Sequence, residues 1–180
     1  VSRKVTSRRW RTDRRVTEGV IRTSWSLRTR AGAYGWIERD GLVLLSLFEG
    51  RDLVSGAAIH QWTLPGGGME YGEQPSDTVV REVFEETGYT VAVGELLGVR
   101  SLYLLAAERF DGGPDDLHSI QVVYRASITG GELVCEVGGS TVDVRWVDPS
   151  EIPTLDRVSL VDAGLAFSRG EPDPWRENEA

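Results

Sequence analysis

The sequence predicts a fold of the α/β or α+β class, in which helices pack on the faces of a β-sheet. Three observations support this prediction: several short runs rich in β-branched and aromatic residues, glycine-containing turns between them, and two stretches with helical spacing of apolar residues. At 180 residues, with 40% hydrophobic and 27% charged residues, the chain has the size and composition of one ordinary globular domain. We therefore expect a single sheet-based domain with short extensions.

Six runs are expected to form strands. They are Ala33–Glu38, Leu42–Phe48, Leu96–Leu105, Ile120–Ile128, Glu132–Val137 and Val142–Val147. The first two are separated by Asp40-Gly41, a pair that supplies the positive φ angles of a tight hairpin turn. Gly130-Gly131 marks another turn.

Two helices are expected, from Pro75 to Thr87 and from about Leu155 to Phe167. Pro75 suits the first helical position because its missing N–H would be unpaired there, and Gly88 stands where a left-handed C-terminal cap belongs. Apolar side chains of the first helix form two i, i+4 pairs that we expect to face the sheet. These pairs are Val79 with Val83 and Val80 with Phe84.

Three glutamates of the first helix share the adjoining face. They are Glu82, Glu85 and Glu86, spaced i, i+3 and i+4. An isolated acidic run is normally a solvated surface, but here Arg81 can pair with Glu85, and the glycine-rich segment 64–68 lies just upstream. Oxygen ligands without histidine or cysteine favour Mg²⁺ or Mn²⁺ over zinc.

These residues resemble the Nudix box, Gly-x5-Glu-x7-Arg-Glu-U-x-Glu-Glu-x-Gly-U, in which U is apolar. The fixed positions are Gly67, Glu73, Arg81, Glu82, Glu85, Glu86 and Gly88, and all seven are present. Tyr89 is an aromatic residue at the last apolar position, where an aliphatic one is usual. A chance match is on the order of one in a million, at roughly 0.07 per fixed residue.

The resemblance covers about residues 30–168 and implies a Nudix-type α/β/α sandwich around a mixed β-sheet. It also implies a hydrolase that acts on a phosphorus-containing acid anhydride and needs Mg²⁺, or alternatively Mn²⁺. By position in the box, Glu85 and Glu86 would bind the metal, and Glu82 would bind metal or orient the attacking water. Arg81 would position these carboxylates, Glu73 would give secondary support, and the backbone carbonyl of Gly66 would be a further ligand.

Many family members have another glutamate, a metal ligand or general base, shortly before the tryptophan-containing strand. This chain has no glutamate in residues 138–143. Glu136 upstream and Asp143 downstream are the nearest candidates, and an ordinary surface role is the alternative for each. The base therefore stays open.

Candidate substrate-binding residues come from aromatic and basic side chains near the expected strands. Tyr34, Trp36 and Tyr103 could stack on a nucleobase, although large aromatics on strands are more often core residues. Arg51 could meet a phosphate, and His118, beside two aspartates, could line the pocket; simple solvation is the alternative for both.

Charge is distributed unevenly along the chain. The net charge is −8, yet residues 1–30 hold ten basic and two acidic residues, a balance of +8, which leaves −16 for the remainder. We expect residues 1–29 to form a basic, flexible arm, residues 30–168 the domain, and residues 169–180 a frayed acidic tail. The arm could be solvated, contact an anionic partner such as RNA or the acidic body, or be an organellar transit peptide.

Other features of composition set the expected surroundings. No apolar run approaches the roughly 18 residues of a membrane span, so we expect a cytoplasmic protein without membrane contact, and a homodimer is possible. The lone Cys135 cannot form an internal disulfide or a cysteine-built metal site.

The expected function is cleavage of a diphosphate linkage in a nucleoside diphosphate joined to another group X. The alternative is a regulatory Nudix module that senses a nucleotide and contacts nucleic acid through its basic arm. A third possibility, an isomerase of allylic diphosphates, needs a suitably placed cysteine, and Cys135 is a poor candidate. Motifs associated with NADH pyrophosphatases and ADP-ribose pyrophosphatases are absent, which disfavours those two subclasses.

Overall fold

The computed structural model describes residues 27–51, 56–106, 109, 113–135 and 138–175. Within them lie seven strands, two α-helices and one short 3₁₀ helix, η2. The strands are β1 (Leu27–Arg39), β2 (Leu42–Arg51), β3 (Ala58–Thr63), β4 (Gly66–Gly68), β5 (Tyr89–Leu104), β6 (Asp116–Gly131) and β7 (Thr141–Val147). The helices are α1 (Pro75–Thr87), η2 (Ile152–Thr154) and α2 (Ser159–Ser168).

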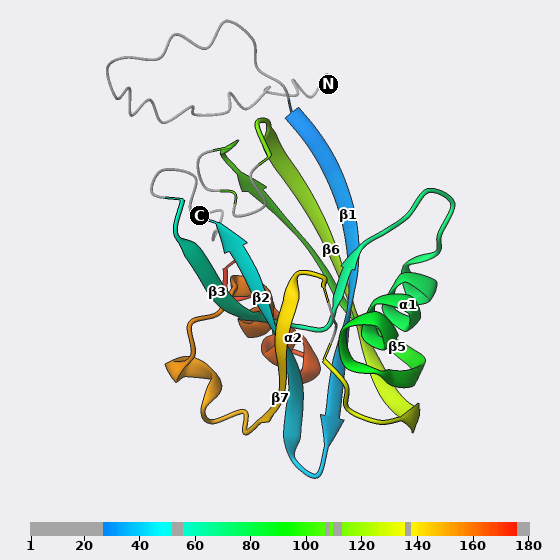
Figure 1. The fold of residues 1–180 in the computed structure, drawn as a ribbon. Coiled ribbons are helices and arrows are strands. Elements are labelled where there is room, and N and C mark those ends of the chain that lie inside the picture. Colours follow the sequence, from blue (N-terminus) through cyan, green and yellow to red (C-terminus); the bar gives the residue numbers. More distant parts are fainter. Residues whose placement is uncertain (1–26, 52–55, 107–108, 110–112, 136–137, 176–180) are drawn as a thin grey trace, which may run out of the picture.

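The strands form a mixed sheet whose main order is β3-β2-β1-β6-β5 (Figure 1). β1 and β6 are parallel, and the neighbouring pairs are antiparallel. Two short strands lie off this path: β4 pairs with β1, and β7 pairs with β2. The predicted mixed sheet is confirmed.

β1 and β2 stay together only near their shared turn. Asp40 and Gly41 have φ angles of 53° and 77°, the conformation expected for this hairpin turn. Only the pairs Glu38↔Val43 and Arg39↔Leu42 join the two strands. Beyond them β1 pairs with β4 while β2 pairs with β7, so the two strands separate and leave space between them.

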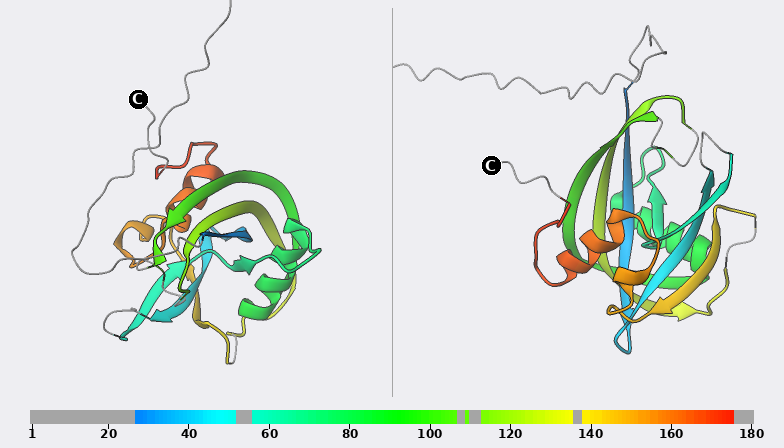
Figure 2. Two further views of the ribbon diagram at one scale, coloured as in Figure 1. Left: turned by 90° about the horizontal axis from the view of Figure 1, so that it is seen from above. Right: turned by 90° about the vertical axis from the view of Figure 1, so that its left-hand side faces the viewer.

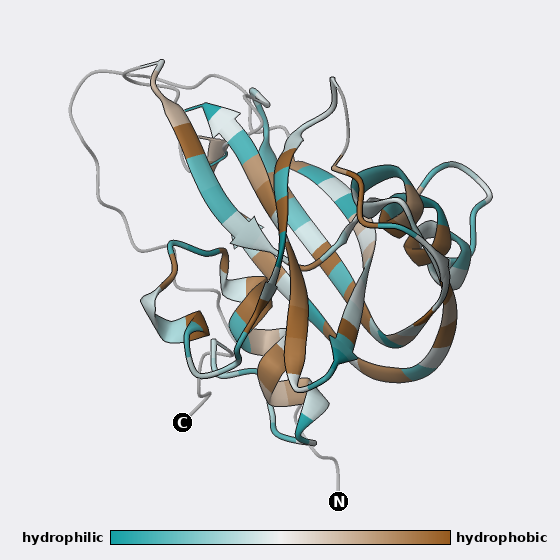
Figure 3. Ribbon diagram, turned by 60° about the horizontal axis from the view of Figure 1, so that its bottom comes forward, coloured by the Kyte–Doolittle hydropathy of each residue, from teal (hydrophilic) through white to brown (hydrophobic). Residues whose placement is uncertain are grey.

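The helices lie on opposite sides of the sheet (Figure 2), which gives the predicted α/β/α sandwich. Alternation along β1 directs Ala33 and Ile37 to the core under α1, and Trp36 to the core under α2. Hydrophobic residues accordingly concentrate on the central strands and on α2 (Figure 3).

Helix α1 has the predicted bounds, and its C-terminal cap Gly88 has a φ angle of 73°. The predicted apolar stripe is only half correct. Val79 and Val83 are fully buried, whereas Val80 is 41% and Phe84 55% exposed. One residue along a helix is a rotation of about 100°, so a face centred on the first pair turns the second pair toward solvent.

Two strands were not predicted, and one prediction was wrong. β4 consists of three glycines, whose strand conformation comes only from pairing with β1. β3 follows the second predicted strand without a recognisable pattern. Residues 132–135, expected to begin a strand, have no regular structure, and residues 136–137 lie outside the described residues.

Helix α2 starts at Ser159 instead of Leu155. Residues 156–158 are extended beside β3, because Trp62 N–H donates to the Asp156 carbonyl (2.9 Å) and Val158 N–H donates to the Trp62 carbonyl (3.0 Å). These two hydrogen bonds hold the backbone extended beside β3 up to Val158, so the helix begins only at Ser159.

The ends of the domain also differ from expectation. β1 begins at Leu27, so residues 27–29 of the expected arm belong to the sheet, and residues 1–26 lie outside the described residues. Residues 169–175, expected to be frayed, pack on the domain: Asp173 Oδ2 lies 3.0 Å from Arg100 Nε, and Trp175 Nε1 donates to Asp162 (3.1 Å). Neither described α-helix has the length and hydropathy of a membrane-spanning helix.

Candidate active site

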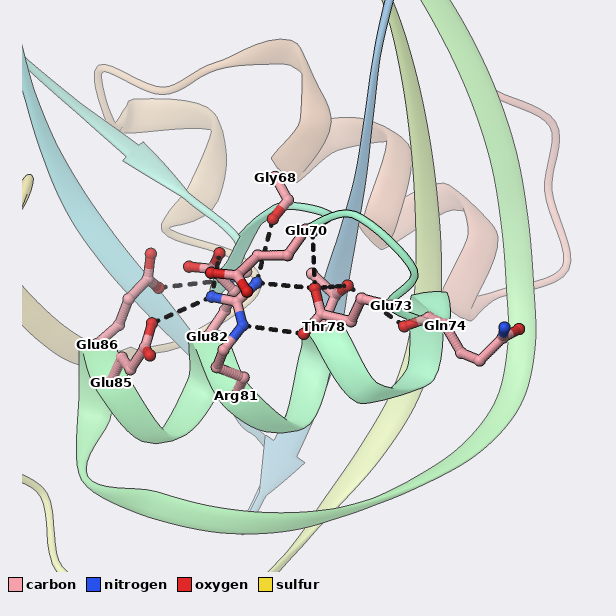
Figure 4. Close-up of polar contacts among 10 residues, drawn as sticks. Gly68, Glu70, Glu73, Gln74, Thr78, Arg81, Glu82, Glu85 and Glu86 are labelled. Atoms are coloured by element: carbon pink, nitrogen blue, oxygen red, sulfur yellow. Dashed lines mark hydrogen bonds and ion pairs between the residues drawn. The ribbon is translucent and has the colours of Figure 1, made fainter.

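Helix α1 and strand β4 place the box residues in one small region (Figure 4). The β4 segment is fixed to β1 by two backbone hydrogen bonds, from Gly35 N–H to the Pro65 carbonyl (2.8 Å) and from Met69 N–H to the Ala31 carbonyl (3.0 Å). A Cβ atom on Gly67 would lie only 2.7 Å from the Glu82 carboxylate. A side chain at Gly67 would therefore push the Glu82 carboxylate out of its present position.

Arg81 organises the acidic face of α1. Its guanidinium donates to both carboxylate oxygens of Glu73 (2.9 Å each), to Glu82 Oε1 (2.8 Å) and to Glu85 Oε2 (3.2 Å). It also donates to the Gly68 carbonyl (3.2 Å), which ties the helix to β4. One cation thus offsets the repulsion among carboxylates that share a helix face.

Glu73 lies just before α1 and holds Arg81 from the side away from Glu85. Besides its two bonds to Arg81, it accepts from the Thr78 hydroxyl (2.7 Å) and from Glu70 N–H (2.9 Å). Hydrogen bonding to Arg81, then to Glu70 and Thr78, lowers the pKa of Glu73 to about 2. All these contacts favour an ionised carboxylate that fixes the orientation of the Arg81 side chain.

Glu86 is the most deeply buried of the acidic side chains on α1, with 8% exposure. It accepts hydrogen bonds from the Ser46 hydroxyl (2.9 Å) on β2 and from Gly66 N–H (3.2 Å) on β4. Thr141, at the start of β7, also hydrogen-bonds its side chain. Burial raises the pKa of Glu86 to about 8, although the hydrogen bonds from Ser46, Gly66 and Thr141 oppose this shift.

The other two glutamates are progressively more exposed. Burial raises the pKa of Glu82, and its contacts with Arg81 act in the opposite direction. The Glu82 side chain is 17% exposed and that of Glu85 is 52% exposed. The three carboxylates therefore run from the protein interior at Glu86 to the surface at Glu85.

The chemistry of these donors fits a hard divalent cation. The oxygen atoms available as ligands belong to carboxylates and to the Gly66 carbonyl. The groups that shift the pKa of the buried Glu86 include no arginine or lysine that would neutralise its charge. Among the described residues, however, no three acidic, histidine or cysteine side chains come close enough to enclose a metal ion. Arg81 holds Glu82 and Glu85 while Ser46 and Gly66 hold Glu86, which keeps the carboxylates apart.

A pocket of about 170 Å³ opens where β1 and β2 separate. Its lining residues are Arg30, Gly32, Tyr34, Phe48, Leu104, Arg109, Leu117, Ser119 and Gln121. Burial raises the pKa of the Tyr34 phenol, the positive charge of Arg30 opposes this shift, and the negative charges of Glu86 and Glu82 add to it. The pocket therefore adjoins the box carboxylates.

Arg30 connects the pocket with the box. Its guanidinium lies against β4, because a Cβ atom on Gly68 would be 2.6 Å from Arg30 Nη2. Arg30 is counted in the sequence analysis only in the charge balance of residues 1–30, since nothing in the sequence shows that β1 begins before it. Ser46, Thr141 and Gln121 were also missed, because each comes from a strand remote in sequence from the box.

Tyr34 is the one predicted substrate residue that lines this pocket. Trp36 is fully buried in the core under α2, the alternative that the sequence analysis left open for it. Tyr103 and His118 alternate with the lining residues Leu104 and Leu117, so they face the opposite side of the sheet. The Tyr103 hydroxyl is instead bonded to Asp116 (2.7 Å).

The remaining candidates are not brought to the box either. Arg51 is exposed at the end of β2, where its guanidinium meets the Gly56 carbonyl (3.5 Å). Val144 packs in the core under α1, so its neighbour Asp143 faces the other way, 3.4 Å from Arg145. Glu136 lies outside the described residues.

The comparisons with known proteins agree with this geometry. A family model described as NUDIX domain matches residues 28–165. The chain belongs to the NUDIX family. The matched region of this Nudix protein contains the whole box and the helix that carries the three glutamates.

Two curated relatives of the Nudix chain are informative. A protein of Bacillus subtilis (strain 168), provisionally named an 8-oxo-dGTP diphosphatase, is 34% identical over 101 residues, which is 56% of this chain and 59% of the relative. An ADP-ribose pyrophosphatase of Methanocaldococcus jannaschii is 34% identical over 121 residues, which is 67% of this chain and 63% of the relative. The chain thus spans about three fifths of the length of these relatives.

Solved structures show the same fold. A Nudix hydrolase from Nitrosomonas europaea has a TM-score of 0.63 at 19% identity, over 82% of this chain and 94% of that one. A MutT protein from Methanosarcina mazei Go1 has a TM-score of 0.59 at 24% identity, over 82% and 98% of the respective chains. The Nudix fold is therefore shared despite low sequence identity.

Proposed function

We propose that this chain is a hydrolase that cleaves a diphosphate linkage in a nucleoside diphosphate joined to another group, and that it needs Mg²⁺ or Mn²⁺. The observation that carries the proposal is the burial of the Glu86 carboxyl on the helix that also carries Glu82 and Glu85, next to a pocket lined in part by Arg30. The names of the two curated relatives, a diphosphatase and a pyrophosphatase, support the same reaction class.

The chain's own residues have separable tasks in this proposal. Glu82, Glu85, Glu86 and the Gly66 carbonyl would hold the cation, which supplies an acidified water and neutralises charge on the phosphates. Arg81, itself fixed by Glu73, holds two of the carboxylates in position. Arg30 would attract the anionic diphosphate to an otherwise acidic region.

The pocket supports a nucleotide as the substrate class. It joins aromatic and apolar walls, from Phe48, Tyr34 and Leu104, to the polar groups of Ser119 and Gln121. This combination suits a flat heterocycle with polar edges. Its volume, about 170 Å³, is several times the roughly 30 Å³ that a water molecule occupies in the liquid.

A substrate screen tests the proposal. Release of phosphate or nucleoside monophosphate is measured for nucleoside triphosphates, ADP-ribose, nucleotide sugars, dinucleoside polyphosphates and capped RNA, in Mg²⁺, in Mn²⁺ and in excess chelator. We expect metal-dependent turnover that rises toward alkaline pH and falls about a hundredfold or more in Glu85→Gln. The control is Glu95→Gln, an exposed carboxylate on β5.

Two results would contradict the proposal. Undiminished turnover in excess chelator would exclude the metal-dependent reaction. Tight nucleotide binding with no turnover of any substrate would instead favour a regulatory module that senses nucleotides.

A further inference from the structure

Gln121 occupies a defined place in the wall of the pocket. It lies on β6, and its side chain forms a hydrogen bond with the phenol of Tyr34 on β1. This bond lowers the pKa of the phenol, as expected when the amide N–H donates to the phenol oxygen. The opposite end of the amide, Oε1, is shielded from solvent and accepts no hydrogen bond from any described residue. The bond to Tyr34 fixes the orientation of the amide and leaves Oε1 as its free acceptor.

An unpaired buried acceptor needs a physical explanation. Leaving such a group without a partner costs about 1–3 kcal/mol, and most buried polar atoms in folded proteins are paired. Gln121 lines a pocket that adjoins the box carboxylates, and a ligand that enters it can supply the missing donor once a shift of the pocket wall exposes Oε1.

The chemistry of that donor can be narrowed. A phosphate is excluded as the partner of Oε1, because its oxygens are acceptors. A sugar would place several hydroxyls against the apolar walls of Leu104, Leu117 and Phe48. A planar heterocycle with an N–H donor on its edge can donate a hydrogen bond to Oε1 and can also pack its faces against the apolar walls.

We propose that Gln121 selects the nucleobase, by accepting a hydrogen bond from an exocyclic amino group through Oε1. This inference rests on the proposed nucleotide substrate and adds a preference for bases that carry such a donor. Tyr34 is a positioning residue, because it fixes the amide of Gln121.

Binding in the presence of a chelator tests the inference without turnover. Dissociation constants are measured by calorimetry for matched nucleoside monophosphates that differ by one amino group: AMP against purine riboside monophosphate, and GMP against IMP. We expect wild type to bind the amino-bearing member of at least one pair about tenfold to a hundredfold more tightly. Gln121→Leu should abolish this difference, and Tyr34→Phe should reduce it.

The control variant is His118→Ala, on the same strand but facing the opposite side of the sheet, and it should keep the wild-type preference. Thermal melting of each variant shows that it is folded. The inference is overturned if wild type does not discriminate within either pair, or if folded Gln121→Leu discriminates as wild type does. Hydrolysis with no base preference would remove this inference alone, whereas base-selective binding without hydrolysis would remove only the proposed reaction.

Discussion

The two protonation states of Glu86 contribute differently to stability. In the unfolded chain its carboxyl has an ordinary pKa near 4.5, and burial raises the pKa to about 8 in the folded protein. Between these values the folded state binds more protons than the unfolded state, so stability falls as the pH rises through this window. Above pH 8 the full cost of the buried carboxylate is present, on the order of a few kcal/mol.

Replacing Glu86 by Gln should remove this pH-dependent cost. Without metal, Glu86→Gln should match wild type near pH 4 and be more stable by about one to a few kcal/mol at pH 9, because the amide oxygen can still accept from Ser46 and Gly66. Denaturant unfolding in a chelator at both pH values measures the difference. A variant that is less stable than wild type at pH 9 would show that the charged carboxylate is itself a structural partner.

The residues around Glu86 show where the sequence stops being informative. The box spacing predicted which carboxylates share a helix face, because helical geometry relates residues three and four apart. It could not predict Ser46 or Thr141, whose contacts with Glu86 depend on the pairing of β2 with β7. For the same reason Asp143 was a reasonable candidate in sequence but faces Arg145.

Among the elements, α1 was the easiest to predict and its burial the easiest to misjudge. Pro75 and Gly88 set its ends by local backbone chemistry. Which of two adjacent apolar pairs faces the sheet depends on tertiary packing, and local pattern does not determine it. The same limit applies to β4, whose glycines have little strand propensity and form a strand only because β1 lies beside them.

Two valines on α1 test its orientation. Val83→Ala removes two buried methyl groups and should lower the free energy of unfolding by about 1–3 kcal/mol, whereas Val80→Ala at a 41% exposed position should change it by less than about 0.5 kcal/mol. Chemical denaturation of both variants gives the comparison. Equal losses would indicate that the helix buries both pairs, as the sequence alone predicted.

The segment after α2 is attached by a buried charge pair. The side chains of Arg100 and Asp173 are only 5% and 10% exposed, and the Arg100 guanidinium also donates to Ser159. Asp173→Asn should therefore leave a buried arginine without its counter-charge and cost roughly 3 kcal/mol. Thermal unfolding beside the exposed control Glu171→Gln measures this, and equal melting temperatures would show that the segment adds no stability.

At the scale of the whole molecule, the separation of β1 from β2 is the feature of the fold that makes room for the proposed active site. It opens the pocket on one side and admits β4 beside α1 on the other. The fold class followed from the sequence because the longer strands and the two α-helices have recognisable periodicities. The pocket did not, because Arg30, Phe48 and Gln121 meet only after three strands are assembled.

The basic arm should be dispensable for the chemistry, because the box and the pocket are built from residue 30 onward. Deleting residues 1–25 keeps β1 whole, so kcat on a small nucleotide should stay within about twofold of wild type. Binding to RNA, if wild type shows it, should weaken and lose its salt dependence. Steady-state kinetics and salt titrations measure both, and a tenfold fall in kcat would place the arm in the active site.

Metal binding itself tests the central claim, that the glutamates of α1 hold a divalent cation. Mn²⁺ affinity is measured by electron paramagnetic resonance for wild type and Glu86→Gln at pH 9, where the buried carboxyl is ionised. The account predicts specific binding by wild type that weakens at least tenfold in the variant, and that also weakens toward pH 6, because a proton must leave Glu86 before the cation can bind. Equal affinity of both proteins for Mn²⁺, or the same wild-type affinity at pH 6 and pH 9, would contradict it.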